Sequence, residues 1–258
     1  MVYHSSMNSE PTPPVVELAR VPALERNSGE SHYGKSISAA HRSSDEPGDA
    51  SRMCVALAGA GVVGRAILVE HLRVGIDILL VDINESAIDQ ASRYAVASVT
   101  NVQATRCASP ISGLAAVRIA KVDSAPTPPS LLIESISENL ELKQRFFAMA
   151  RQSLGPSCVL ATNTSNLSVR DIFASLPGDT NSLGLHFFMP VDQRPLIELI
   201  RRAETCDAAI EKCSRLAARL AKPLLFTADT PGFVVNRLLA PYLNQSLLLL
   251  GRGATADQ

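Results

Sequence analysis

The chain has 258 residues, 46% of them apolar and 19% charged, which is enough to bury the core of one large domain or two small ones. Its net charge of −1 at pH 7 gives no general field that would attract nucleic acid or an anionic membrane. No apolar run approaches the roughly 20 residues of a membrane span, and the N-terminus lacks the apolar stretch of a secretory signal. We therefore expect a cytoplasmic protein, without nucleic-acid partners, that recognises phosphate only through a local site.

Residues 1–51 differ in composition from the rest of the chain. They contain ten serines and five prolines but few bulky apolar residues. Such a segment cannot bury enough surface to offset the entropy lost on ordering. We predict that these residues form a disordered tail without chemistry of its own.

From Met53 onward, short apolar runs alternate with segments of helical periodicity. The predicted buried strands are residues 54–58, 78–81, 131–134, 159–162, 183–187, 196–200 and 224–227. The predicted helices between them are residues 62–74, 86–102, 140–153 and 207–220. This alternation indicates an α/β domain over residues 52–228, with a doubly wound, mostly parallel sheet and helices on both faces.

The C-terminal segment, residues 229–258, has a different texture. Residues 229–232 read DTPG and predict a turn, and residues 233–250 have the pattern of a very apolar helix. A helix this apolar requires neighbours, yet the chain ends eight residues later. We interpret the segment as the first helix of a truncated, all-helical C-terminal domain, and we expect poor solubility or altered association.

The five cysteines are Cys54, Cys107, Cys158, Cys206 and Cys213. Their number is odd, none forms a C-x-x-C pair and none has a close histidine, which argues against a disulfide framework and a zinc site. We interpret them as buried, reduced thiols and expect no metal.

A glycine-rich turn follows the first predicted strand and opens the first predicted helix. Residues 59–64 read GAGVVG, which fits the G-x-G-x-x-G fingerprint of Rossmann-like dinucleotide-binding domains. In such a turn Gly59 allows the tight bend, Gly61 lets the backbone approach a pyrophosphate, and Gly64 allows close packing of helix on strand. The helix start, at Val62 and Val63, offers free N–H groups to the phosphates.

Asp82 gives this turn its context. It stands at the end of the second predicted strand, 18 residues beyond Gly64. A carboxylate there can accept hydrogen bonds from the adenosine ribose and would repel the 2′-phosphate of NADP. The sequence therefore favours a cofactor site over an ordinary strand–helix turn, and it favours NAD as the cofactor.

Further motifs follow in a fixed order. Residues 133–143 read IESISENLELK, residues 161–167 read ATNTSNL, and residues 184–190 read GLHFFMP before PLIELI at 195–200. Residues 229–239 read DTPGFVVNRLL. Together with the glycine turn these motifs resemble the L-3-hydroxyacyl-CoA dehydrogenases over about residues 53–256.

The resemblance implies an enzyme that uses NAD to oxidise (S)-3-hydroxyacyl-CoA to 3-oxoacyl-CoA in fatty-acid β-oxidation. It also implies a homodimer that needs the complete C-terminal domain. The implied site residues are His186 as catalytic base, Glu198 as its partner, Ser165 and Asn236 at the reacting oxygen, and Glu138, Lys143 and Asn163 beside the cofactor.

The chemistry of the residues agrees with these roles. Oxidation of a secondary alcohol needs a base with a pKa near ambient pH, and a carboxylate would fix the tautomer of the His186 imidazole. Glu198, in an otherwise apolar strand, needs such a partner. Ser165 and Asn236 could instead serve only as local caps. Glu138 and Lys143 could belong to a solvated first helical turn, and His71 is expected to face outward.

The sequence departs from the family at three places. Met189 replaces a usual asparagine, and Arg194 replaces a usual apolar residue, which would alter the fit of the acyl chain. The family's arm is shortened here to residues 86–130 and carries few basic residues, so it is a weak candidate for binding the CoA phosphates.

Two other functions remain open from sequence. One is a non-catalytic NAD-binding fragment that lacks a complete substrate and dimerisation domain. The other is a dehydrogenase of a free hydroxy acid, favoured by the weak CoA arm.

Overall fold

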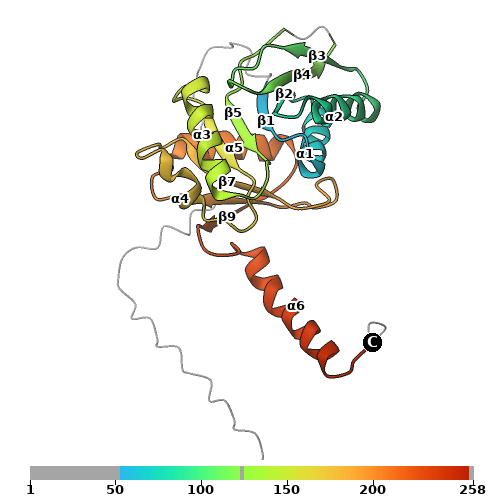
Figure 1. Cartoon of the computed structure of the whole chain (residues 1–258), viewed down its shortest axis with the longest axis vertical. Helices are drawn as coiled ribbons and strands as arrows, with labels where there is room; N and C mark the ends of the chain where they lie inside the picture. The colour runs from blue at the N-terminus through green and yellow to red at the C-terminus, as the bar shows by residue number, and fades with distance from the viewer. Residues whose placement is uncertain (1–52, 123–124, 256–258) are drawn as a thin grey trace, which may run out of the picture. The chain divides into compact units, whose positions relative to one another are not determined.

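A computed structural model describes residues 53–122 and 125–255 (Figure 1). All of them belong to one compact unit, residues 47–258. The tail predicted at residues 1–51 lies outside the described residues. None of the helices in the described part is long and apolar enough to cross a membrane.

A nine-stranded sheet forms the centre of the described chain, in the order β3-β4-β2-β1-β5-β6-β7-β8-β9. Its strands are β1 (Cys54–Ala58), β2 (Asp77–Asp82), β3 (Val102–Cys107), β4 (Ala115–Lys121), β5 (Leu131–Glu134), β6 (Val159–Thr162), β7 (Ser182–Phe187), β8 (Ile197–Arg201) and β9 (Leu224–Ala228). The central strands β2, β1, β5, β6 and β7 run parallel. β4 and β3 extend the sheet antiparallel beyond β2, and β8 pairs antiparallel with β7. This confirms the predicted Rossmann-like, mostly parallel fold.

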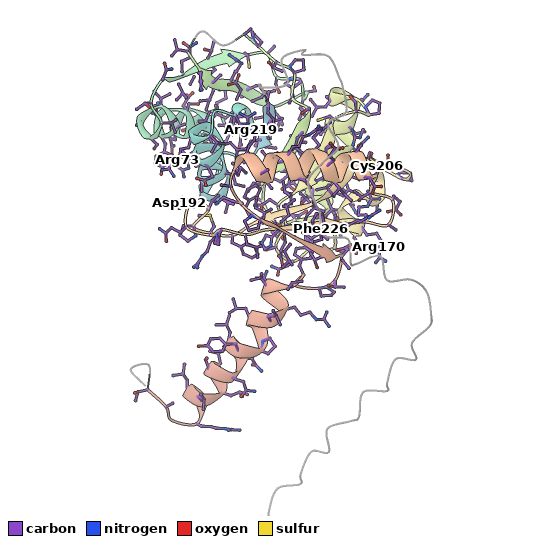
Figure 2. The ribbon with its side chains drawn as sticks, turned by 180° about the vertical axis from the view of Figure 1, so that it is seen from behind. Arg73, Arg170, Asp192, Cys206, Arg219 and Phe226 are labelled. Atoms are coloured by element: carbon purple, nitrogen blue, oxygen red, sulfur yellow. The ribbon has the colours of Figure 1, made fainter. Side chains whose placement is uncertain are left out.

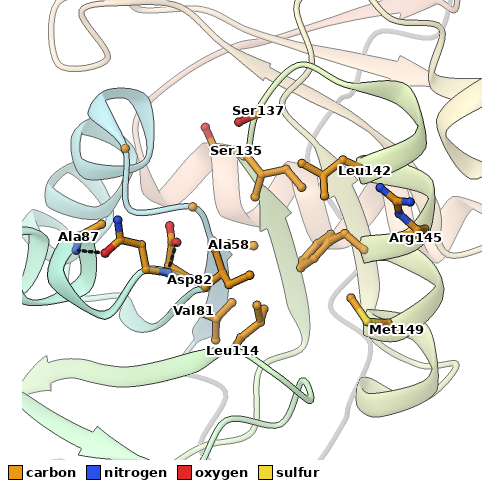
Figure 3. Close-up of a pocket in the computed structure, with 16 residues that line it drawn as sticks. Ala58, Val81, Asp82, Ala87, Leu114, Ser135, Ser137, Leu142, Arg145 and Met149 are labelled. Carbon is orange, nitrogen blue, oxygen red and sulfur yellow. Dashed lines mark hydrogen bonds between the residues drawn. The ribbon is translucent and has the colours of Figure 1, made fainter.

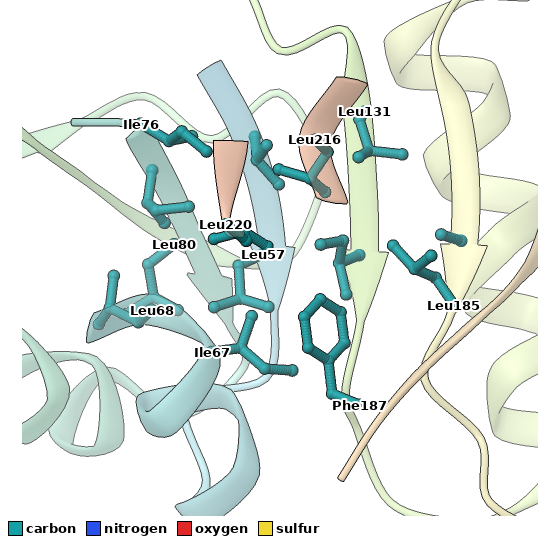
Figure 4. Packing of buried hydrophobic residues seen from close by; sticks show 14 of the residues in the cluster. Leu57, Ile67, Leu68, Ile76, Leu80, Leu131, Leu185, Phe187, Leu216 and Leu220 are labelled. Carbon is teal, nitrogen blue, oxygen red and sulfur yellow. The ribbon is translucent and has the colours of Figure 1, made fainter. Parts of the chain in front are cut away.

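Helices cover both faces of the sheet. They are α1 (Val62–Arg73), α2 (Glu85–Ser98), α3 (Leu140–Leu154), α4 (Val169–Ile172) and α5 (Asp207–Arg219), with a 3-10 turn at Phe173–Ser175. The last helix, α6 (Val235–Gly251), has no buried residue. One apolar cluster joins α1, α2 and α5 to the sheet (Figure 4). A second cluster joins α3 and α4 to the opposite face. Figure 2 shows α5 from behind, with Cys206 and Arg219 at its two ends.

Strand β1 shows why helices cover both faces of the sheet. All five of its residues are buried. Val55 and Leu57 belong to the cluster under α1 and α5, whereas Ala56 and Ala58 belong to the cluster under α3. Because successive side chains of a strand point to opposite faces, a continuous apolar run predicts a strand with a helix layer on each side.

The predicted strands and long helices lie where the sequence indicates, within about two residues. Two corrections concern residues 86–130. The helix predicted over 86–102 ends at Ser98, because Asn101 adopts a left-handed conformation (φ 59°) that turns the chain into β3. The hairpin of β3 and β4 was not predicted, because every residue of β3 except Val102 is exposed and polar residues occupy half of its positions.

Two expectations about single side chains were wrong. His71 does not face outward but is fully buried, and its Nδ1 lies 2.7 Å from the carbonyl oxygen of Ile67. Cys107 is exposed on the edge strand β3 rather than buried, although all five cysteines are free thiols. The ring of Phe187 lies near that of His71, and six of the twelve residues of α1 are buried, so more of its circumference is covered than its sequence pattern indicates.

Candidate active site

The candidate site lies at the carboxyl ends of the parallel strands. From β1 the chain passes to β2 on one side and later enters β5 on the other side of β1. The loops that follow β1 and β5 therefore diverge, and a crevice for ligands opens at this point of the sheet.

The glycine turn is built as the sequence predicts. Gly59 has a φ of +103°, and a Cβ there would lie 2.4 Å from the carbonyl oxygen of Ser135. A Cβ on Gly64 would lie 1.9 Å from the carbonyl oxygen of Gly59, so helix α1 can approach the turn only without a side chain. Gly61 is different, because a Cβ there would meet nothing within 4 Å. The space beside Gly61 is open for a ligand.

A pocket of about 500 Å³ lies beside this turn (Figure 3). Its walls include Gly59, Gly61 and Asp82. The Asp82 carboxylate accepts hydrogen bonds from the backbone N–H of Ala60 (2.7 Å) and of Asn84 (2.8 Å). Each carboxylate oxygen has two lone pairs, so both oxygens can still accept a hydroxyl group of a ribose.

A second pocket, of about 590 Å³, continues from the first. The two share Gly61 and the loop residues 135–137, so one elongated ligand could occupy both. Of the residues predicted from sequence, the second pocket brings together Gly61, Val62, Val63, Glu138, Asn163, Ser165, His186 and Asn236.

His186 and Glu198 form a buried pair behind the second pocket. They face each other across the antiparallel strands β7 and β8, and His186 Nδ1 lies 2.8 Å from Glu198 Oε2. The Glu198 side chain is fully buried, and that of His186 is 5% exposed. A carboxylate only accepts hydrogen bonds, so Nδ1 carries the hydrogen and Nε2 is left as the basic nitrogen.

The second oxygen of Glu198 binds the start of α6. Its Oε1 accepts hydrogen bonds from the backbone N–H of Val234 (3.0 Å) and of Val235 (2.9 Å). Phe233, just before them, is buried, and its ring centroid lies 5.8 Å from that of His186. Glu198 therefore joins the histidine to the turn that begins α6.

Ser165 and Asn236 contact each other at the wall of the second pocket. Asn236 Nδ2 donates to the backbone carbonyl of Ser165 at 3.1 Å. Glu138 Oε1 accepts hydrogen bonds from the Thr164 hydroxyl and from the backbone N–H of Ser165 (3.1 Å) and Asn166 (3.3 Å). Glu138 thus holds the turn that carries Ser165.

Lys143 is not part of a solvated helical turn, because its side chain is only 1% exposed. Its Nζ lies 2.5 Å from Glu134 Oε1 and 3.2 Å from Glu138 Oε2, and Lys143 lines neither pocket. Glu134 was missed from sequence. The available signal was an acid at the end of an apolar strand, nine residues before a lysine in the first turn of a helix.

Asn163 is held on two sides. Its Oδ1 accepts from the backbone N–H of Phe187 (2.8 Å), and its Nδ2 donates to Ser135 Oγ (3.4 Å). Met189, one of the departures from the family, lines the second pocket and is 41% exposed. Arg194 contacts the carbonyl oxygen of Met189 at 3.3 Å.

Two of the four basic residues of the shortened arm form ion pairs with acidic side chains. Arg106 pairs with Glu85 and Asp89, and Arg118 pairs with Asp77. These ion pairs support the expectation that residues 86–130 are a weak site for CoA phosphates.

Fold and site together define a dinucleotide-binding oxidoreductase with a histidine–carboxylate pair. The family model described as the 3-hydroxyacyl-CoA dehydrogenase NAD-binding domain matches residues 54–230. The chain belongs to the 3-hydroxyacyl-CoA dehydrogenase family, and NAD is its cofactor.

Similar proteins agree with this membership. A probable 3-hydroxyacyl-CoA dehydrogenase of Caenorhabditis elegans is 33% identical over 208 residues, which cover 77% of this chain and 67% of the relative. The solved structure of M. tuberculosis FadB2 has a TM-score of 0.65 at 26% identity, covering 79% of this chain and 73% of FadB2. The (S)-3-hydroxybutyryl-CoA dehydrogenase of Ralstonia eutropha has a TM-score of 0.63 at 25% identity, covering 79% and 74%.

Proposed function

We propose that this chain oxidises (S)-3-hydroxyacyl-CoA to 3-oxoacyl-CoA with NAD, as a step of fatty-acid β-oxidation in the cytoplasm. One observation carries the proposal. The imidazole of His186 borders the second pocket, and the buried carboxylate of Glu198 lies 2.8 Å from its Nδ1. The names of the relatives support the substrate class, and the five free thiols support a reducing compartment.

The role of His186 is that of a general base. In the oxidation the alcohol carbon loses a hydride and its hydroxyl group loses a proton, which Nε2 accepts. The imidazolium that forms carries its positive charge next to Glu198, and this carboxylate is held by two backbone N–H groups. The arrangement stabilises the charge that develops during proton transfer.

The reacting oxygen would be oriented by Ser165 and Asn236. In the described part of the chain the Ser165 hydroxyl makes no hydrogen bond, while its backbone is fixed by Glu138 and Asn236. A free hydroxyl on a fixed backbone can hold the substrate oxygen in one orientation, which lowers the entropic part of the barrier.

NAD, when bound, accepts the hydride on its nicotinamide ring. Its adenosine would occupy the first pocket against Asp82, its pyrophosphate would lie beside Gly61, Val62 and Val63, and its nicotinamide would reach Asn163. Gly59 and Gly64 would shape the turn. We place the boundary of the NAD-binding domain near residue 228, with residues 229–258 beginning a helical domain that would contribute to a homodimer.

The test follows NADH absorbance during reduction of acetoacetyl-CoA. The wild-type chain is expected to oxidise NADH, and His186→Ala is expected to lose turnover on the order of 10³-fold or more. NADH fluorescence titration of His186→Ala serves as the control, because its glycine turn and Asp82 are unchanged. Folded wild-type protein that binds NADH without turnover would instead indicate the non-catalytic alternative.

A substrate comparison separates the remaining alternative. The same assay with free 3-oxo acids in place of CoA thioesters distinguishes a dehydrogenase of free hydroxy acids. Preference for the thioester is expected. Preference for the free acid would contradict the proposed substrate class while leaving the role of His186 intact.

A further inference from the structure

A buried charge network lies next to the loop of residues 135–137, which lines both pockets. Glu134 ends β5, between Ala58 of β1 and Thr162 of β6, and it is fully buried. Its Oε1 accepts hydrogen bonds from the Ile136 N–H (2.8 Å) and the Lys143 ammonium (2.5 Å). Its Oε2 accepts from the Thr162 hydroxyl (2.7 Å). Glu134 lines neither pocket, so it can affect the reaction only through its neighbours.

Lys143 connects Glu134 to the candidate site through ion pairs. Its ammonium lies between two carboxylates, those of Glu134 and Glu138, and within the described chain it has no other ion-pair partner. A buried lysine is costly unless it is paired, so Glu134 is the group that allows Lys143 to stand where it does. Lys143 in turn occupies Oε2 of Glu138, which leaves Oε1 to face the turn after β6.

The two carboxylates have different electrostatic surroundings. Burial raises the pKa of Glu134, against the opposing effects of Lys143 and the hydrogen bonds. Partial burial also acts to raise the pKa of Glu138, but the Thr164 hydroxyl, Lys143 and the Ser165 N–H together lower it. The lowered pKa favours the ionised form of Glu138, which accepts the hydrogen bonds of the backbone N–H groups of the Ser165 turn.

We propose that Glu134 is a positioning residue of this dehydrogenase: through Lys143 it holds the Glu138 carboxylate against the turn that presents Ser165 to the reacting oxygen. This inference rests on the proposed function for the role of Ser165. The contacts that carry it run without a gap from β5 through α3 to the turn after β6.

The first test is Glu134→Gln, which removes the charge and keeps the size of the side chain. We expect kcat with acetoacetyl-CoA to fall on the order of 100-fold, because loss of the network misplaces Ser165. The affinity for NADH should change far less, because Asp82 and Gly61 lie on other elements. In amide hydrogen exchange, the N–H groups of Ser165 and Asn166 should exchange at least about tenfold faster.

The matched control is Asp179→Asn. Asp179 is another largely buried carboxylate, paired with Arg151 at 2.8 Å, and neither residue lines the two pockets. Asp179→Asn should lower the stability of the fold, but it should leave kcat and the exchange of Ser165 and Asn166 as in the wild type.

A second variant separates positioning from stability. Glu134→Gln combined with Lys143→Met removes both charges of the fully buried pair, so its stability should recover relative to Glu134→Gln. If Glu134 positions the turn, kcat stays low in the double variant. Recovery of kcat together with stability would overturn the proposal, as would unchanged exchange at Ser165 and Asn166 in Glu134→Gln.

The outcomes also separate the two proposals. An inactive wild-type chain would contradict the proposed function, and the exchange measurement would still decide whether Glu134 orders the turn. An active wild type with an equally active Glu134→Gln would contradict only the inference on Glu134.

Discussion

Gly61 and Gly64 belong to one turn, yet a methyl group would have opposite consequences at the two positions. At Gly64 it would lie 1.9 Å from a backbone oxygen, whereas at Gly61 it would meet no protein atom within 4 Å. Gly64 is therefore required by packing, and we expect Gly61 to be required by the pyrophosphate of NAD.

Gly64→Ala is predicted to destabilise the fold by about 3 kcal/mol, because helix α1 must move away from the turn. Gly61→Ala should keep the unfolding free energy within about 1 kcal/mol of the wild type, since its φ of −69° suits alanine. It should nevertheless raise the Kd for NADH at least about tenfold, because the methyl group occupies the space beside the pyrophosphate. Urea unfolding and NADH titration measure the two effects. Wild-type affinity in Gly61→Ala would contradict a phosphate site here.

At the scale of single residues, the sequence could predict those whose neighbours form a motif. His186 and Glu198 stand on adjacent antiparallel strands and lie directly opposite each other in their register. Glu134 has only the weaker signal of an acid that ends an apolar strand ahead of a lysine, and His71 has none. Both are buried because of elements distant in sequence: β6 and α3 around Glu134, and Phe187 beside His71.

At the scale of elements, the sequence predicts strands correctly where both faces of the strand are buried. The strands β1, β5 and β6 are buried throughout, and their predicted bounds agree with the structure. The hairpin of β3 and β4 was not predicted because β3 is an exposed edge strand with polar residues at half of its positions, held by backbone pairing with β4. Backbone hydrogen bonds of this kind leave no periodic signal in the side chains.

Helix α1 carries a buried histidine with consequences for acid stability. His71 is fully buried, its Nε2 has no hydrogen-bond partner, and burial lowers its pKa from 6.5 to about 4. The unfolded chain therefore binds a proton between these values that the folded chain does not. Since the unfolded state holds more protons there, stability falls as pH decreases from about 6.5 toward 4 and then levels off.

We predict that His71 alone lowers the unfolding free energy by about 2 kcal/mol between pH 7 and pH 5. His71→Leu removes the titrating group from the same buried site, so its unfolding free energy should depend less on pH by that amount. Urea unfolding of both proteins at the two pH values measures the difference. Parallel pH profiles would show that the ring of His71 can take up a proton in the folded state.

At the scale of the whole molecule, no hydrophobic core forms around α6 among the described residues. The helix contacts the domain through its first residues, Val235 and Asn236, but none of its 17 residues is buried. Leu238, Leu243 and Leu247 are 73%, 52% and 65% exposed. Exposed apolar surface of this extent favours association with another protein surface.

We predict that the 258-residue chain self-associates through α6. In size-exclusion chromatography with light scattering, its measured mass should exceed the monomer mass of 27.5 kDa. Leu243→Glu with Leu247→Lys places a favourable i,i+4 pair on one face of α6, so the helix is retained while its apolar face is interrupted. The double variant should elute as a monomer and bind NADH as the wild type does, because the nucleotide pocket lies on other elements. Val96→Glu, at an exposed position of α2, is the control and should leave the association unchanged. A wild-type chain that runs as a sharp monomer at high concentration would show that the apolar face of α6 does not drive self-association.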